Sequence, residues 1–233
     1  EKHTLIYFAG IPGGGWKPRE VFLNKLWTYR LWSYHYIIKE KGIMTKKGNK
    51  VNLFLDSGAF SAWSQGEAID IYEYIRFIKE NEEFIDVYAN LDVIGDPQGT
   101  WNNQMIMEKA GLMPTPVYHY GEDPKWLRRI LSRGYKYISL GGMVPISNKD
   151  LMKWLDEIWG TYLTDDNGYP ICQVHGFGLT SHVLMLRYPW YSVDSTSWVV
   201  TGRMGSVFVP RRKNGVWIYN ENCWKIAVSN KSP

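Results

Sequence analysis

Three aspartates in this sequence come directly after short apolar segments. Asp56, Asp92 and Asp194 each follow a run rich in strand-forming side chains. Such runs predict buried strands, so the three carboxyl groups are expected at strand ends. Carboxylates can act there as nucleophile and as proton shuttle. This is the chemistry of retaining glycosidic exchange, which replaces a substituent at a sugar C1′ through a covalent intermediate.

Two histidines and a pair of glycines end further segments of this kind. His119 and His175 follow apolar runs, and Gly141-Gly142 closes another. Glycines let a ligand approach the backbone closely because they have no side chain. Three aspartates and two histidines could also hold a divalent cation, but the sequence shows no closely spaced pair of ligands. We therefore expect carboxylate chemistry without a metal or another cofactor.

Each of these residues also has a simpler structural interpretation. Asp56 precedes Ser-Gly and could be a turn or helix N-cap residue, and Asp92 could cap the Gly-Asp-Pro turn that follows it. His119, His175 and Phe60 could belong to the core. A fold that gathers the strand ends in one place would favour the chemical interpretation.

The segments between these residues alternate between strand and helix patterns. Seven short apolar runs, the first at Leu5–Ala9 and the last at Trp190–Val193, are separated by segments with helical spacing, such as Pro124–Ser132. Glu20–Lys39 is also expected to be a helix. This alternation is typical of parallel strands joined by crossover helices.

The C-terminal part predicts one more pair of strands and a last strand. Ser206–Pro210 and Val216–Asn220 are expected to form a hairpin, and Lys225–Ser229 an eighth barrel strand. We therefore expect an α/β fold, a (β/α)8 TIM-type barrel with a small β-hairpin inserted before the last strand. Residues 1–233 would form a single domain, and an open parallel sheet is the alternative. A barrel would gather the strand ends into one ring.

Three motifs carry a resemblance to a known family. Residues 55–60, Leu-Asp-Ser-Gly-Ala-Phe, resemble the Asp-Ser-Gly-Gly-Phe/Tyr motif of tRNA-guanine transglycosylases, and residues 137–142, Tyr-Ile-Ser-Leu-Gly-Gly, resemble their Tyr-x-Gly-Leu-Gly-Gly loop. Asp194 with Arg203, Gly205 and Phe208 resembles the stretch in which that family's nucleophilic Asp is followed by Arg-Asn-Gly-x-x-Phe. Overall the chain is most similar to the phage 7-deazaguanine DNA transglycosylases, pentosyltransferases that exchange guanine in DNA for a base such as preQ0 without ATP.

The resemblance implies a role for each matching residue. Asp194 would be the nucleophile at C1′ of the deoxyguanosine, and Asp56 the general acid and base. Asp92 would read N1 and the 2-amino group of guanine. In the same motif as Asp56, Ser57 would contact the substrate and Phe60 would stack on the base. The backbone of the glycine pair 141–142 would read a base edge.

Departures from the family's pattern bear on the substrate. His119 and His175 are also expected to contact the substrate. His119 stands where relatives have Gln, and His175 where they have Met, so the donor to O6 and the second stacking wall are open. The Cys-x-Cys-x-x-Cys zinc site of the tRNA enzymes has no counterpart, since the only cysteines are Cys172 and Cys223. This absence favours DNA over tRNA. Four cations after the nucleophile are candidates for phosphate contacts: Arg203, Arg211, Arg212 and Lys213.

Composition is compatible with this interpretation. The net charge of +4 is mildly basic, and 12 Trp and 16 Tyr can stack on bases as well as fill a core. No segment has the apolar length of a membrane span, and no signal peptide opens the chain, so we expect no membrane partner and a location in the cytoplasm, that of the host if a phage encodes the protein. The start without Met indicates a processed or trimmed terminus. A helper protein could open duplex DNA.

Other functions compete with this one. The chain could be a tRNA-guanine transglycosylase that lacks the zinc site, or a catalytically silent barrel that binds nucleic acid. It could also be an unrelated carboxylate- or metal-dependent barrel hydrolase. Retention of both Asp56 and Asp194 argues against the silent barrel.

Overall fold

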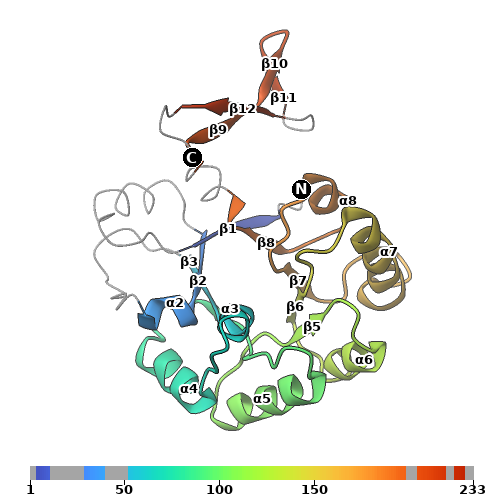
Figure 1. The fold of residues 1–233 in the computed structure, drawn as a ribbon. Helices are drawn as coiled ribbons and strands as arrows, with labels where there is room; N and C mark the ends of the chain where they lie inside the picture. Colours follow the sequence, from blue (N-terminus) through green and yellow to red (C-terminus); the bar gives the residue numbers. More distant parts are fainter. Residues whose placement is uncertain (1–3, 11–28, 40–51, 198–203, 219–222, 229–233) are drawn as a thin grey trace.

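A parallel sheet of eight strands organises the chain. The computed structural model describes residues 4–10, 29–39, 52–197, 204–218 and 223–228. The strands lie in the order β4-β3-β2-β1-β8-β7-β6-β5, and helices lie outside the sheet (Figure 1). Their bounds are β1 Leu5–Ala9, β2 Tyr29–Ser33, β3 Asn52–Asp56, β4 Val87–Tyr88, β5 Val117–His119, β6 Tyr137–Gly141, β7 Gln173–Gly176 and β8 Ser192–Ser195.

The sheet curls until its two end strands approach each other. The segments that follow β4 and precede β5 meet at one parallel bridge between Ala89 and Thr115. There the N–H of Asn90 donates to the carbonyl of Thr115 at 3.0 Å, and the N–H of Thr115 donates to the carbonyl of Tyr88 at 2.9 Å. No ladder within the described residues extends this bridge. The sheet is therefore (β/α)8-like and curled, without the continuous closure of a full barrel.

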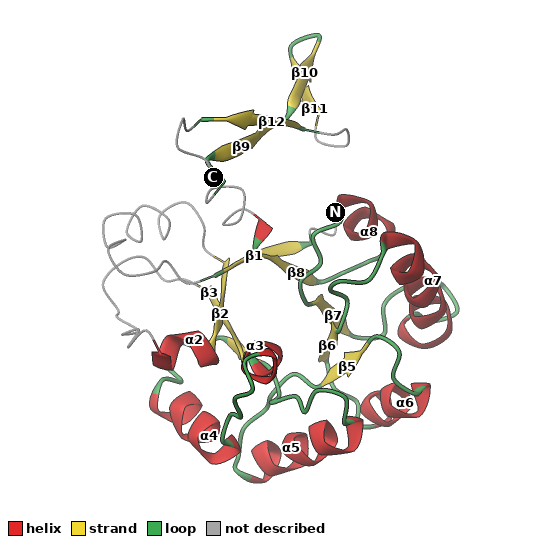
Figure 2. Ribbon diagram, viewed as in Figure 1, coloured by secondary structure: helices red, strands yellow, loops and turns green. Residues whose placement is uncertain are grey.

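Helices cover the outer side of the curled sheet, except for the short α3, which lies inside the circle of the other helices (Figure 2). Their apolar faces point toward the strands: in α4, Tyr74, Ile75 and Ile78 are buried, and the Asp70 side chain caps the first turn. The helices are α2 Tyr34–Lys39, α3 Ala59–Ser64, α4 Ile71–Glu80, α5 Pro97–Lys109, α6 Pro124–Ser132, α7 Asn148–Ile158, which continues as a π-helical turn Trp159–Leu163, and α8 His182–Arg187.

The interior of the ring is packed with side chains. Tyr7 and Phe54 meet edge to face with ring centroids 5.5 Å apart, and His175 lies 4.5 Å from Phe54. Arg30, which is fully buried, donates to the carbonyl of Gly10 at 3.4 Å. The ring therefore encloses a core, and space for a ligand is left at one end.

One strand of the curled sheet was predicted to be part of a helix. Within the expected helix Glu20–Lys39, residues 29–33 are strand β2 and residues 34–39 are helix α2, whereas residues 20–28 lie outside the described part. With β2 included, the sheet already contains eight strands, β1 to β8. The prediction that Lys225–Ser229 is the eighth barrel strand is therefore wrong.

The C-terminal pairing also differs from the prediction. Strand β9, Ser206–Val209, pairs with β12, Trp224–Ala227, and β10, Arg211–Lys213, pairs with β11, Val216–Ile218. The chain leaves β9 at Pro210, which lacks the N–H that would continue the ladder. Asn214 and Gly215 then form the two-residue turn, with φ of 50° and 82°. These strands follow β8 and lie outside the ring (Figure 1).

Among the described residues, no helix has both the length and the apolar character needed to cross a membrane.

Candidate active site

A cavity of about 850 Å³ lies where the strands of the ring end. The last residues of β1, β2, β3 and β5 line it, as expected for the carboxyl-terminal face of a parallel curled sheet. Seven of the predicted site residues line this cavity: Asp56, Phe60, Asp92, His119, Gly141, Gly142 and Asp194. The structure thus brings together residues that are far apart in the sequence.

A tight turn fixes Asp56 at the end of β3. The N–H of Gly58 donates to Asp56 Oδ2 at 3.0 Å. Gly58 has φ of 77°, and a Cβ there would lie 2.2 Å from Ser33 Oγ and 2.6 Å from His35 Cβ, so only glycine fits. Ser57 is buried and its Oγ accepts the N–H of Ala59 at 3.3 Å. Ser57, predicted to contact the substrate, does not line the cavity and supports the start of α3 instead.

The environment of Asp56 favours its protonated form. Burial, followed by the charges of Asp92 and Asp194, raises the pKa of Asp56 to about 7, although hydrogen bonds from the N–H groups of Gly58 and Ser57 act in the opposite direction. A carboxyl group with this pKa can both give and accept a proton at neutral pH. Asp56 therefore has the property that a general acid and base requires.

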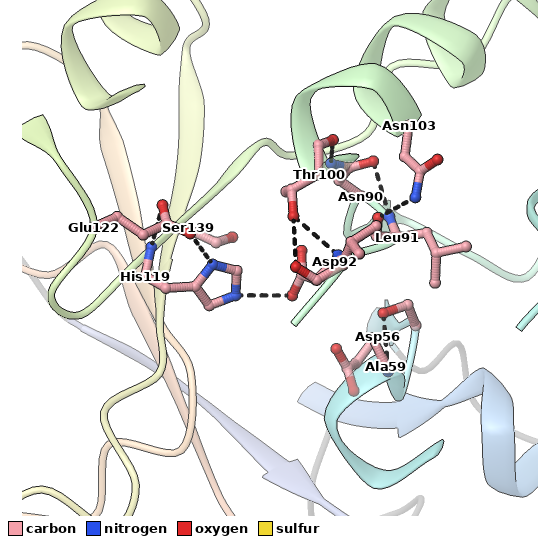
Figure 3. A network of polar contacts seen from close by, with 12 residues as sticks. Asp56, Ala59, Asn90, Leu91, Asp92, Thr100, Asn103, His119, Glu122 and Ser139 are labelled. Atoms are coloured by element: carbon pink, nitrogen blue, oxygen red, sulfur yellow. Dashed lines mark hydrogen bonds and ion pairs between the residues drawn. The ribbon is translucent and has the colours of Figure 1, made fainter. Parts of the chain in front are cut away.

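Helix α5 holds the loop that carries Asp92. Thr100 Oγ1 accepts the N–H of Val93 at 2.9 Å, and the buried Asn90 side chain donates to the carbonyl of Thr100 at 2.8 Å. The Asn103 side chain donates to the carbonyl of Leu91 at 2.9 Å. Figure 3 shows these bonds beside Asp92 and opposite Asp56. The loop after β4 is thus anchored on both sides of the carboxylate.

His119 lies between two carboxylates. Its Nε2 is 3.1 Å from Asp92 Oδ2, and its Nδ1 is 3.1 Å from Glu122 Oε1 (Figure 3). Burial lowers the pKa of His119, but the two carboxylates outweigh this effect and raise it to about 10. The imidazole is therefore a cation at neutral pH with both N–H groups engaged. Asp92 Oδ1 is buried and has no hydrogen-bond partner among the described residues.

The glycine pair makes room for this cation. A Cβ on Gly141 would lie 2.9 Å from His119 Cδ2, and one on Gly142 would lie 3.2 Å from the backbone N of Tyr120. Gly142 also has φ of 68°, a conformation that favours glycine. The pair borders the cavity, as the prediction of a backbone contact with a ligand requires, and it is also needed to seat His119.

Asp194 lies on β8 with its carboxylate at the cavity. Its Oδ1 accepts the N–H of Gly178 at 2.8 Å and lies 3.3 Å from His175 Nε2. His175, predicted to contact the substrate, is fully buried and does not line the cavity. Phe177, which packs against His175 with ring centroids 4.6 Å apart, lines the cavity in its place.

Phe60 lines the cavity, and Trp63, which does not, packs against Phe60. Phe60 is 57 % exposed, and Trp63, one turn later on α3, is 58 % exposed; their ring centroids are 5.9 Å apart. Phe60 was predicted from the sequence, whereas Trp63, Phe177 and Glu122 were not. Trp63 could have been found from its spacing of three residues after Phe60 on one helix, but the pairing of Glu122 with His119 depends on the turn after β5. Phe177 lies in the His-Gly-Phe-Gly segment, of which only His175 was predicted to be a site residue.

The predicted phosphate contacts lie away from the carboxylates. Arg211, Arg212 and Lys213 are exposed on β10, and none of them lines the cavity. Arg212 lies over Trp217, 5.4 Å from the ring centroid, and its Nε donates to the carbonyl of Gly215 at 3.0 Å. Arg203 lies outside the described residues. In the part of the chain that the structure describes, no group of three or more His, Cys, Asp and Glu side chains has the arrangement of a metal site.

A scan against protein-family models and a search of curated proteins found no match for this chain.

Proposed function

We propose that this protein exchanges guanine in DNA for a 7-deazaguanine base such as preQ0, through a covalent intermediate between Asp194 and deoxyribose. The observation that supports this proposal most strongly is the grouping of Asp56, Asp92 and Asp194 in one cavity, where burial, followed by the charges of Asp92 and Asp194, raises the pKa of Asp56 to about 7. The three motifs that resemble transglycosylases supply the assignment of roles. The proposal takes the curled sheet as a functional (β/α)8 barrel of the TIM type.

The exchange needs two displacements at one carbon atom. In the first, the Asp194 carboxylate forms a bond to C1′ while the bond from C1′ to N9 of guanine breaks, and protonated Asp56 gives its proton to the leaving base. In the second, the Asp56 carboxylate takes the N9 proton of the incoming base, whose nitrogen bonds to C1′ as the ester to Asp194 breaks. Protons and electrons balance over the cycle, so neither an oxidant nor ATP is required.

The cavity offers matching groups for the base. Asp92 Oδ1 is available to accept hydrogen bonds from N1–H and the 2-amino group of guanine, since Oδ2 is held by His119. Phe60 offers an exposed ring for stacking. In this proposal His119 acts through Asp92, because both of its nitrogens face carboxylates.

One observation favours DNA over tRNA, and a second argument favours single strands over a duplex. The sequence has no counterpart of the zinc motif of the tRNA enzymes. A base must also leave the stack to reach carboxylates inside a cavity, which costs a few kcal/mol in a duplex and less in single strands. The exposed Phe60 and Trp63 beside the cavity offer surfaces on which unstacked bases can bind. Arg211, Arg212 and Lys213 remain candidates for backbone contacts at a distance from the reaction.

An exchange assay tests the function and its polymer together. Single-stranded DNA, duplex DNA and tRNA, each carrying labelled guanine, are incubated with the protein and preQ0, and released guanine is counted. We expect release from DNA, faster from single strands, and none with Asp194→Ala. Release from tRNA alone would establish the zinc-free tRNA enzyme instead. Release from neither polymer would refute base exchange.

A further inference from the structure

A chain of polar side chains runs from Asp194 into the interior of the ring. His175 Nε2 lies 3.3 Å from Asp194 Oδ1, and His175 Nδ1 lies 2.6 Å from Ser192 Oγ. Ser192 Oγ lies 2.5 Å from the hydroxyl of Tyr137. His175 and Ser192 are fully buried. The mechanism above makes no use of His175, Ser192 or Tyr137.

The strand register places these side chains on one face. His175 is the direct partner of Ser192 in the parallel pair β7 and β8. Ser192 and Asp194 are two residues apart on β8, so both point to the same side of the sheet. The chain is therefore built into the core of the ring, where it is shielded from solvent.

The environment determines where the protons lie. Burial raises the pKa of Tyr137 far above its ordinary value, so its hydroxyl keeps its proton and can donate to Ser192. Ser192 can then donate to His175 Nδ1, which leaves the imidazole proton on Nε2. A lone pair on Nε2 would instead face a carboxylate oxygen at 3.3 Å, a repulsive contact in a buried site.

The contact between the imidazole and the carboxylate is close but poorly aligned. His175 Nε2 has no hydrogen bond of good geometry among the described residues, although Asp194 Oδ1 is within ion-pair distance. A buried N–H without a partner is costly, because the group has lost its hydrogen bonds to water. A small rotation of the Asp194 carboxylate would therefore be favourable, because it would complete this bond.

We propose that His175 is a positioning residue for Asp194, donating its Nε2–H to Oδ1 so that Oδ2 is the atom that bonds to C1′. This inference rests on the proposed function. Gly178 supplies the second donor to Oδ1 at 2.8 Å. During the first displacement the bond between Oδ2 and C1′ forms as the bond between C1′ and N9 breaks, and the leaving base takes its proton from Asp56. No proton moves along the chain of His175, Ser192 and Tyr137.

The two donors matter most when the sugar leaves Asp194. The negative charge then returns to the carboxylate, and hydrogen bonds from His175 and Gly178 stabilise it. Removal of the His175 donor should therefore slow the second displacement by about 10- to 100-fold. The covalent intermediate should last longer by the same factor.

The tautomer of His175 can be measured without any substrate. The ¹⁵N resonances of the imidazole in the wild-type protein should show a protonated Nε2. An unprotonated Nε2 with the proton on Nδ1 would overturn the inference. Replacement of Ser192 by Ala removes the hydroxyl that donates to Nδ1, so this variant should contain a mixture of tautomers. An unchanged spectrum would contradict the assigned direction of the hydrogen bonds from Tyr137 through Ser192 to His175.

Variants of His175 separate positioning from packing. His175→Gln keeps an N–H near the place of Nε2, whereas His175→Met has similar size without a donor. We expect His175→Gln to keep the lifetime of the intermediate near that of wild type and His175→Met to lengthen it by about 10- to 100-fold. Equal lifetimes in the two variants would overturn the inference. Circular dichroism shows whether each variant is folded.

A matched control comes from another buried polar pair in the ring. Thr115 Oγ1 lies 3.1 Å from Ser139 Oγ. Ser139 is the register partner of His175, but neither hydroxyl is hydrogen-bonded to His175, Ser192 or Tyr137. Thr115→Val should leave the lifetime of the intermediate unchanged. If wild-type protein releases no base from any polymer, the proposed function fails, and the ¹⁵N spectrum still decides whether His175 donates to Asp194.

Discussion

His119 and Asp92 form an ion pair inside the cavity, with Nε2 and Oδ2 3.1 Å apart. Glu122 holds the other imidazole nitrogen at the same distance. Two carboxylates and one imidazolium thus carry a net charge of −1, close to the carboxyl group of Asp56. The charge balance of this cavity, together with burial, determines which group can carry a proton.

His119→Gln should make the stability of the protein less dependent on pH. The pKa of His119 is raised from its ordinary 6.5 to about 10 by Asp92 and Glu122, in spite of burial. Because the folded state binds this proton more tightly, the stabilisation is fully present below pH 6.5 and is lost as the pH rises through about 10. Denaturant unfolding at pH values across this window should show a decline in wild type, on the order of a few kcal/mol, that is smaller in the variant. Parallel declines would show that His119 is not charged in the folded protein.

The two displacements should respond to pH in opposite directions. Burial and the neighbouring carboxylates raise the pKa of Asp56 to about 7. Release of guanine needs the protonated form and should fall above pH 7, whereas capture of the incoming base needs the carboxylate and should fall below it. Rapid-quench measurements of each step should show both transitions, that of the second step at lower pH, because Asp194 is then an uncharged ester and no longer raises the pKa of Asp56.

Asp56→Asn provides the control for this assignment. The variant should lose both pH transitions and react about 100- to 10,000-fold more slowly, since general acid and base catalysis is removed. If the transitions persist in the variant, another group is the proton carrier.

Gly58→Ala should lower the free energy of unfolding by more than about 2 kcal/mol. A Cβ would clash with Ser33 and His35, and φ is 77°. Gly66→Ala is the matched control, because φ there is 71° but no atom lies within 4 Å of the added Cβ. Gly66→Ala should lower the free energy of unfolding only by the strain of the backbone conformation, about 1–2 kcal/mol. Chemical denaturation of the two variants measures the difference, and equal losses would refute the steric argument.

Phe60→Ala should raise KM for DNA by roughly 5- to 150-fold with little change in stability, as expected for the loss of one stacked base. Phe60 is 57 % exposed and lines the cavity. Tyr72→Ala is the control, since Tyr72 is 67 % exposed on α4 and does not line the cavity. Steady-state kinetics with a single-stranded oligonucleotide distinguishes the two. A KM like that of wild type would show that Phe60 does not stack on a base.

The sequence predicted the parallel alternation because most strands are continuous apolar runs. Strand β2 was missed because Arg30, an ionic residue, interrupts Tyr29–Ser33, and Leu23, Leu26 and Leu31 have helical spacing. In the structure Arg30 is buried within the ring. A buried cation does not look like a core residue in the sequence. The apolar pattern alone therefore could not identify β2 as a strand.

The grouping of the carboxylates was predictable, but the direction of each side chain was not. His175 and Asp194 were expected to follow the ends of their strands, whereas β7 and β8 extend to Gly176 and Ser195 and contain them. This shift puts His175 within a strand, where alternation points it into the core rather than toward a ligand. The partnership of His119 with Glu122 depends on the turn after β5, which the sequence pattern did not specify.

A covalent adduct between Asp194 and DNA tests the central claim most directly. The protein is mixed with a guanine-containing oligonucleotide without an incoming base, denatured, digested and analysed by mass spectrometry. We predict a deoxyribose-linked mass on the peptide that contains Asp194, formed with release of one guanine and absent from Asp194→Asn. Guanine release without an adduct, or an adduct on another residue, would contradict the mechanism proposed for this cavity.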